Sequence, residues 1–148
     1  MDPYITVADA DTYFENRYNV TIWDQADDDD KEKALKDMTL RIDRLNFIGI
    51  KADEDQEKQF PRYGDTTVPL DIQYACAEGA FALLDGIDPE RELELLGMKS
   101  QGLASARSTF DRSFAPEHFL AGIPSAMAWN YLKPYLIDPE NVQITRVT

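Results

Sequence analysis

The chain has 148 residues, of which 43% are apolar, enough to bury one hydrophobic core, and its length favours a single domain spanning 1–148. Its formal charge of −13 comes from 28 acidic and 15 basic residues, and no run of Lys and Arg forms a basic patch, which argues against a generic affinity for nucleic-acid phosphates. The longest apolar run, 75–84, is interrupted by Glu78 and Gly79, so we expect no membrane span. The start of the chain carries no secretory signal, which predicts a protein that stays in the cytoplasm where it is made.

The first half of the chain predicts two amphipathic helices. Thr6 followed three residues later by Asp9 approximates a capping box and predicts a helix over 7–17. Four aspartates at 27–30 then precede an apolar stripe and complement the dipole at the start of a second helix, which Gly49 would end. The predicted buried face of this second helix consists of Ala34, Leu35, Met38, Ile42 and Leu45.

A long polar connection and a helix of small residues follow. Residues 50–67 contain Pro61 and Gly64 and predict a loop longer than most connections. Pro69 suits the first turn of a helix, and the small residues after it would let neighbouring helices approach closely. The predicted inward positions of this helix are Ile72, Cys76, Ala80 and Leu83, and a short helical segment is expected from 88 to 96.

The last third of the chain predicts an arm, a helix and a tail. Residues 98–110 are small and polar and predict a β-hairpin or extended arm. A helix over 125–136, kinked by Pro134, would place Met127, Ala128, Tyr131, Leu132 and Tyr135 inward. Residues 142–147 alternate like a strand and would need a partner from another chain. The expected fold is mainly α: a small helical bundle with its core at about 4–96 and 124–136, an arm at about 98–110 and an extended C-terminal arm at about 138–148.

No residue pattern predicts a catalytic, cofactor or metal site, and we expect no enzyme activity. The aspartates at 27–30 lack the spacing of a calcium loop. His118 is the single histidine, with no nucleophile motif to serve, and Cys76 has the apolar neighbours of a packed thiol. The alternating Glu90, Glu92 and Glu94 favour a solvated face over acid–base work.

Arg62 follows Phe60 and Pro61, and proline restricts Phe60 to extended geometry, which fixes the direction of the guanidinium. Arg62 could pair with a carboxylate of its own chain or of a neighbour, or bind phosphate, and the sequence favours an architectural role.

Several motifs occur in one order that resembles the head–tail connector proteins (adaptor or head-completion proteins) of tailed phages: Tyr4 to Asp11 with Tyr13 and Phe14, Trp23, Lys31 with Ala34 and Leu35, Asp43 to Leu45, Gln56 to Arg62, and Val68 with Pro69. Within that family the Phe60 position usually holds Trp. The resemblance implies a structural protein of the virion neck that forms a ring, commonly of twelve copies, between the portal and a tail terminator or other neck protein, with DNA passing through the ring without specific binding. The residues expected at assembly interfaces are Arg62, Met98, Gly102, Leu103, Phe110, Val142, Ile144, Arg146 and Val147.

Relatives of this kind are also labelled DnaT-like single-stranded DNA-binding proteins, so a second function stays open. In that alternative, Tyr4, Tyr13, Tyr18 or Trp23 would stack bases beside a cationic groove. The aromatic residues are present, but the sequence offers no basic stripe, and the acidic composition favours a ring through which DNA passes.

Overall fold

A computed structural model describes residues 1–103 and 115–138 of the chain. The mainly α prediction is confirmed, and the part of the chain that the structure describes contains no named strand. None of its helices has the length and apolar character needed to span a membrane. In chain order the elements are α1 (Val7–Phe14), α2 (Thr21–Gln25), α3 (Asp28–Asp43), α4 (Leu70–Leu84), α5 (Pro89–Leu103), α6 (Glu117–Leu120), α7 (Ala126–Leu132) and the 3-10 helix η2 (Lys133–Tyr135).

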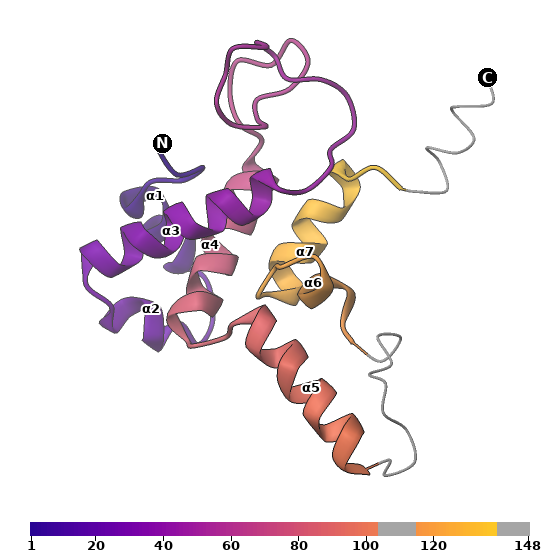
Figure 1. Ribbon diagram of the computed structural model, residues 1–148. Coiled ribbons are helices and arrows are strands. Elements are labelled where there is room, and N and C mark those ends of the chain that lie inside the picture. The colour runs from indigo at the N-terminus through magenta and orange to yellow at the C-terminus, as the bar shows by residue number, and fades with distance from the viewer. Residues whose placement is uncertain (104–114, 139–148) are drawn as a thin grey trace, which may run out of the picture.

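The core forms where α4 lies between α3 and α7 (Figure 1). The predicted apolar stripe of α3 supplies Leu35, Met38 and Ile42, all fully buried. Gly79 of α4 permits a close contact here, because a Cβ there would lie 2.2 Å from the Met38 sulfur and the Met38 side chain would have to move. The predicted close approach of small residues therefore occurs between α3 and α4. The other fully buried members of this core are Ile72, Ala75, Cys76, Ala77, Ala80, Ala128 and Leu132.

Side-chain caps fix the starts of three helices. The sequence indicates the Thr6 cap and the acidic start at 27–30. The Thr6 hydroxyl accepts a hydrogen bond from the Asp9 amide at 3.1 Å, and the Asp27 carboxylate accepts one from the Asp30 amide at 2.8 Å. Ser125 caps α7 in the same way through the Ala128 amide. The ends agree less well, since α1 stops at Phe14 rather than at residue 17.

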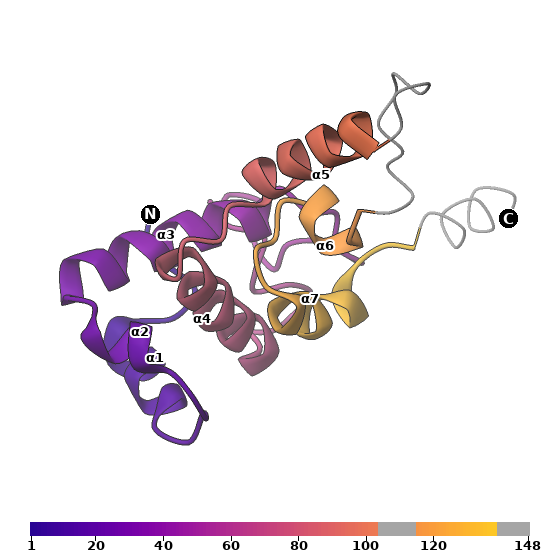
Figure 2. The ribbon, with the colours of Figure 1, turned by 90° about the horizontal axis from the view of Figure 1, so that it is seen from below.

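Residues 47–63 fold back on themselves like a hairpin, and an isolated bridge rather than regular strands pairs the two arms. We call this segment the ribbon. Lys51 lies opposite Arg62 in an antiparallel bridge, with the Tyr63 amide donating to the Ile50 carbonyl at 2.9 Å. A second bridge joins Phe47 at the start of the ribbon to Leu136 after η2. The ribbon stands at one end of the molecule, and α5 extends from the other end (Figure 1). Figure 2 shows α6 beside α5.

The predicted β-hairpin or extended arm is wrong over residues 98–103, because α5 continues as a helix to Leu103. Pro89 occupies the first turn of α5, and the Glu, Leu, Met, Lys and Gln residues that follow are strong helix formers whose preference outweighs the glycines at 97 and 102. Met98, Gly102 and Leu103 therefore belong to a helix. The rest of that arm, 104–110, lies outside the described residues.

The final helix is shorter than predicted, and one of its five predicted inward residues, Met127, faces outward. α7 ends at Leu132, and Pro134 lies in the 3-10 turn that follows, where its missing N–H breaks no helical ladder. Met127 was predicted to face inward but is 41% exposed, whereas Ala128 and Leu132 are buried. The inward face of α7 is therefore set by Ala128 and Leu132.

Candidate functional site

Arg62 holds the ribbon together from inside. Its side chain is buried, and its guanidinium donates through Nε to the Ile48 carbonyl at 2.9 Å and through Nη1 to the Gln59 carbonyl at 3.1 Å. Nη1 also donates to the Gln59 side-chain oxygen at 3.0 Å, and Nη2 donates to the Gly49 carbonyl. A planar guanidinium with five N–H donors suits such a cluster of carbonyls, which an ammonium could not satisfy at once. The guanidinium of Arg62 therefore donates its hydrogen bonds to acceptors of its own chain.

The N-terminus anchors the ribbon to α3. The Tyr4 hydroxyl donates to the Asp43 carboxylate and accepts from the Phe60 amide at 3.2 Å. The Asp43 carboxylate also accepts from the Gln59 amide at 3.2 Å. Burial raises the pKa of Asp43 above its usual 3.8, and the hydrogen bond from Tyr4 opposes that rise. The ribbon is thus held at its base by α3 and at its centre by Arg62.

A small hollow of about 230 Å³ lies where the ribbon meets the end of α7, and we call it the notch. The notch forms because the Ile48 amide donates to the Tyr135 carbonyl at 2.9 Å, which brings residues 48 and 135 together. Two apolar side chains at the notch stay accessible, Ile48 at 49% exposed and Tyr63 at 58%. Its lining residues are Ile48, Phe60, Arg62, Tyr63, Asp65, Pro69, Pro134 and Tyr135.

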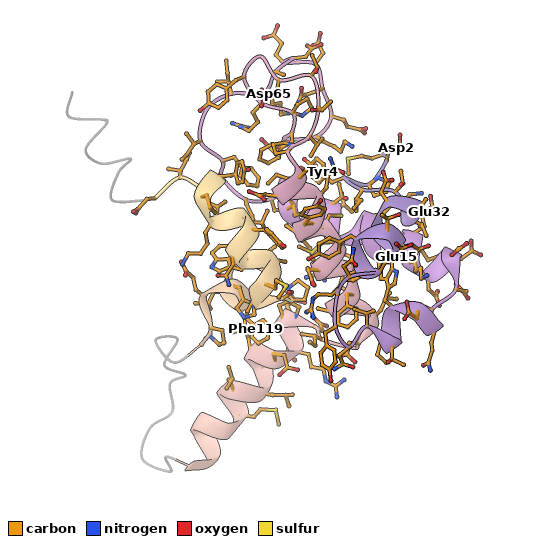
Figure 3. The ribbon with its side chains drawn as sticks, turned by 180° about the vertical axis from the view of Figure 1, so that it is seen from behind. Asp2, Tyr4, Glu15, Glu32, Asp65 and Phe119 are labelled. Atoms are coloured by element: carbon orange, nitrogen blue, oxygen red, sulfur yellow. The ribbon has the colours of Figure 1, made fainter. Side chains whose placement is uncertain are left out.

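The outer face of α5 forms a second accessible apolar surface. Leu95 is 41% exposed and Met98 is 66% exposed, one turn apart on the helix, with exposed Arg91 and Glu94 beside them. We call these four residues the α5 ridge. Figure 3 shows Asp65 of the notch well separated from Phe119, which lines a hollow with Leu93 of α5. The ridge and the notch are therefore two separate surfaces.

The predicted interface residues fall into three groups. Arg62 lies in the wall of the notch, and Met98 lies on the α5 ridge at the other end of the molecule, so the structure does not bring these two together. Gly102 and Leu103 lie in the last turn of α5. The remaining members of the set lie outside the described residues: Phe110, Val142, Ile144, Arg146 and Val147. Their participation in an interface stays a prediction.

Most of the aromatic residues considered for base stacking are used in the core. Trp23 and Tyr4 are buried, and the Trp23 indole donates to the Asp11 carboxylate at 2.8 Å. The Tyr13 ring stacks on Tyr74 at 4.6 Å beside a hollow of about 650 Å³. Tyr18, by contrast, is 90% exposed. Tyr18 is thus the member of the predicted set whose ring is open on both faces.

Many of the described cations have acidic partners. Arg17 lies 2.8 Å from Glu78 and Lys31 lies 3.0 Å from Asp11. Within residues 1–103 and 115–138, no ion pair involves Lys33, Arg44 or Arg91, and Lys51 and Lys58 donate to backbone carbonyls instead. Further pairs join Lys36 to Glu32, Arg41 to Asp37 and Lys133 to Glu117. A phosphate-binding surface would have to rely on a small number of separate cations.

The groups considered for catalysis or metal binding lie in structural settings. Cys76 is fully buried, and burial raises the pKa of its thiol to about 11, which keeps it protonated. His118 Nδ1 lies 2.8 Å from the Ile123 carbonyl. Among the residues that the structure describes, no three His, Cys, Asp or Glu side chains are placed to hold a metal ion.

Residues 1–94 match the model of a protein family described as "Putative DnaT-like ssDNA binding protein". The match covers α1 to α4 and ends within α5, so it does not include α7. No curated protein and no solved structure matches the chain.

Proposed function

The chain belongs to the DnaT-like ssDNA binding protein family, and from that premise and its two surfaces we propose that it is a structural subunit that assembles around DNA. Copies of the chain would form a ring in the neck of a tailed phage, between the portal and the next neck or tail component. DNA would pass through this ring. The subunit would act in the virion, without an enzymatic step.

The presence of two accessible apolar surfaces at opposite ends of the molecule carries this proposal. Ile48 and Tyr63 at the notch and Leu95 and Met98 on the ridge present apolar area to solvent. Two unlike surfaces on one chain allow head-to-tail contacts, which close into a ring when the rotation between copies permits it. The ordered motifs that resemble head–tail connectors add support for the phage neck as the place of that ring.

The charge distribution is compatible with a channel that does not retain DNA. The chain carries a formal charge of −13, and ion pairs or carbonyl contacts occupy cations such as Arg17, Lys31 and Arg62. An acidic surface repels the phosphate backbone, so DNA could move past it with little friction.

Single-stranded DNA binding is the second candidate, and the family description supports it more directly than it supports a phage ring. Tyr18 offers an exposed ring for base stacking, and Lys33 and Arg44 of the α3 segment could contact phosphates. Such a site would combine one aromatic platform with a few cations.

Fluorescence anisotropy with a labelled oligothymidine, run beside mass photometry of the same sample, separates the two functions. The ring proposal predicts oligomers and DNA affinity weaker than about 100 µM near physiological salt. Binding at low micromolar protein that Tyr18→Ala weakens by about tenfold would reject the ring in favour of single-stranded DNA binding. Leu40→Ala, a change at another exposed apolar side chain, is the matched control.

A further inference from the structure

We propose that the α5 ridge of one copy docks into the notch of the next copy, with Met98 and Leu95 as the apolar anchors. This inference rests on the proposed assembly function and names the two surfaces that would make its contact. The occupant of the notch is therefore a second copy of this chain.

The shapes of the two surfaces correspond. The ridge is convex because α5 extends away from the core helices (Figure 1), and Met98 is the more exposed of its two apolar side chains. The notch is concave, and its volume of about 230 Å³ has room for the end of one large apolar side chain. Ring faces and aliphatic carbons from Phe60, Tyr63 and Pro134 line it. A flexible thioether adapts well to such an irregular apolar hollow.

The charges around the two surfaces are also complementary. On the ridge, exposed Arg91 lies one turn before Leu95, and exposed Glu94 directly precedes it. At the notch, exposed Asp65 lines the hollow, and exposed Lys133 lies outside the lining, next in sequence to the lining residue Pro134. Lys133 lies 3.8 Å from Glu117 and remains half exposed, so it can exchange that partner for another carboxylate. Arg91 facing Asp65 and Glu94 facing Lys133 would offset locally the repulsion between two acidic chains.

The placement of the surfaces defines the symmetry. Because the ridge and the notch are at opposite ends of one chain, each copy would offer a ridge to one neighbour and a notch to the other. Such a contact is heterologous and propagates until it closes. A two-fold dimer of ridge with ridge, or of notch with notch, would need only one of the surfaces.

Two single variants test this arrangement. Met98→Asp removes the anchor, Ile48→Asp blocks the notch, and Leu40→Asp on α3 is the exposed apolar control. Each of the first two should weaken self-association by at least tenfold, and the control should not change it. Mixed together, Met98→Asp and Ile48→Asp should form a one-to-one heterodimer and nothing larger, since the mixture retains one good ridge and one good notch.

Mass photometry of the separate and mixed samples gives the outcome. Oligomers that persist in both variants would overturn the proposal. Self-association lost in one variant alone would indicate a two-fold contact and would also overturn it. Loss in both, with the heterodimer restored by mixing, supports the head-to-tail contact.

Cysteine cross-linking tests proximity in the full chain even when the contact is weak. The native Cys76 is buried and protonated, so its reaction with a maleimide is slow. A mixture of Met98→Cys and Ile48→Cys chains treated with a short bismaleimide should give a covalent dimer in at least tenfold greater yield than either chain alone. Equal yields would reject the contact. If the wild-type chain forms rings but this cross-link fails, the docking inference is wrong and the assembly function stands; a wild-type chain that stays monomeric at all concentrations would contradict both.

Discussion

Arg62→Met should cost about 3 kcal/mol of unfolding free energy. Methionine keeps an apolar side chain but not the guanidinium, so the loss measures the hydrogen bonds of the guanidinium together with its contact 5.9 Å from the Phe60 ring centroid. A hydrogen bond from a charged donor contributes roughly 1.5–3 kcal/mol, and Arg62 makes such bonds to the Ile48 carbonyl and to both oxygens of Gln59. The ribbon lies near solvent, and water would satisfy part of the lost bonds, which reduces the sum of these terms to about 3 kcal/mol.

Urea denaturation followed by circular dichroism measures this loss. Arg91→Met is the matched control, because Arg91 is exposed and its guanidinium has no partner among the described residues, and it should change stability by less than about 0.5 kcal/mol. A loss below about 1 kcal/mol for Arg62→Met, or equal losses for the two variants, would refute the argument that the hydrogen bonds of Arg62 stabilise the ribbon.

Three further changes test the core. Leu35→Ala should destabilise the chain by about 2–5 kcal/mol in urea denaturation, because it leaves a cavity at a fully buried position, whereas Lys36→Ala on the solvent face should stay within about 0.5 kcal/mol; the reverse ranking would contradict the assigned face of α3. Gly79→Ala should lower stability by about 1–3 kcal/mol, since the new methyl group overlaps the Met38 side chain, and an unchanged melting temperature would contradict the close contact of α3 with α4. Burial raises the pKa of Glu78 above its ordinary 4.5, so the folded chain binds more protons than the unfolded chain and the contribution of Glu78 to stability grows as the pH falls from 7 toward 4.5. Glu78→Gln should flatten that dependence in thermal melts across this pH range, and an unchanged slope would contradict it.

Local signals in the sequence predict much of the helical core. The apolar stripe of α3, its acidic start at Asp27 and the Thr6 cap of α1 each act within a few residues, so the sequence alone reveals them. α5 shows where that approach failed. The small and polar residues of 98–110 suggested an extended arm, but the helix continues to Leu103 because most of the residues after Pro89 are good helix formers.

The notch and the hydrogen bonds of Arg62 could not be predicted from local signals in the sequence. The notch exists because the ribbon reaches the chain beyond α7, with Ile48 bound to Tyr135, and nothing near either residue in sequence indicates the other. Apart from the Gln59 side chain, the acceptors of Arg62 are backbone carbonyls, which carry no residue-type signal. The sequence indicated that Arg62 has a fixed direction, and the structure adds the carbonyls to which it points.

Salt acts in opposite directions on the two candidate functions. Copies that each carry a formal charge of −13 repel one another, so a contact made by Met98 and Leu95 should strengthen as salt screens the surface charges over a Debye length of about 8 Å at physiological ionic strength. Binding to single-stranded DNA instead releases counterions and weakens steeply as salt rises. Oligomers that grow between about 50 and 300 mM NaCl, without a salt-sensitive DNA complex, therefore fit a subunit that assembles by apolar contact, whereas a DNA complex that dissociates over the same range fits the function in the family description.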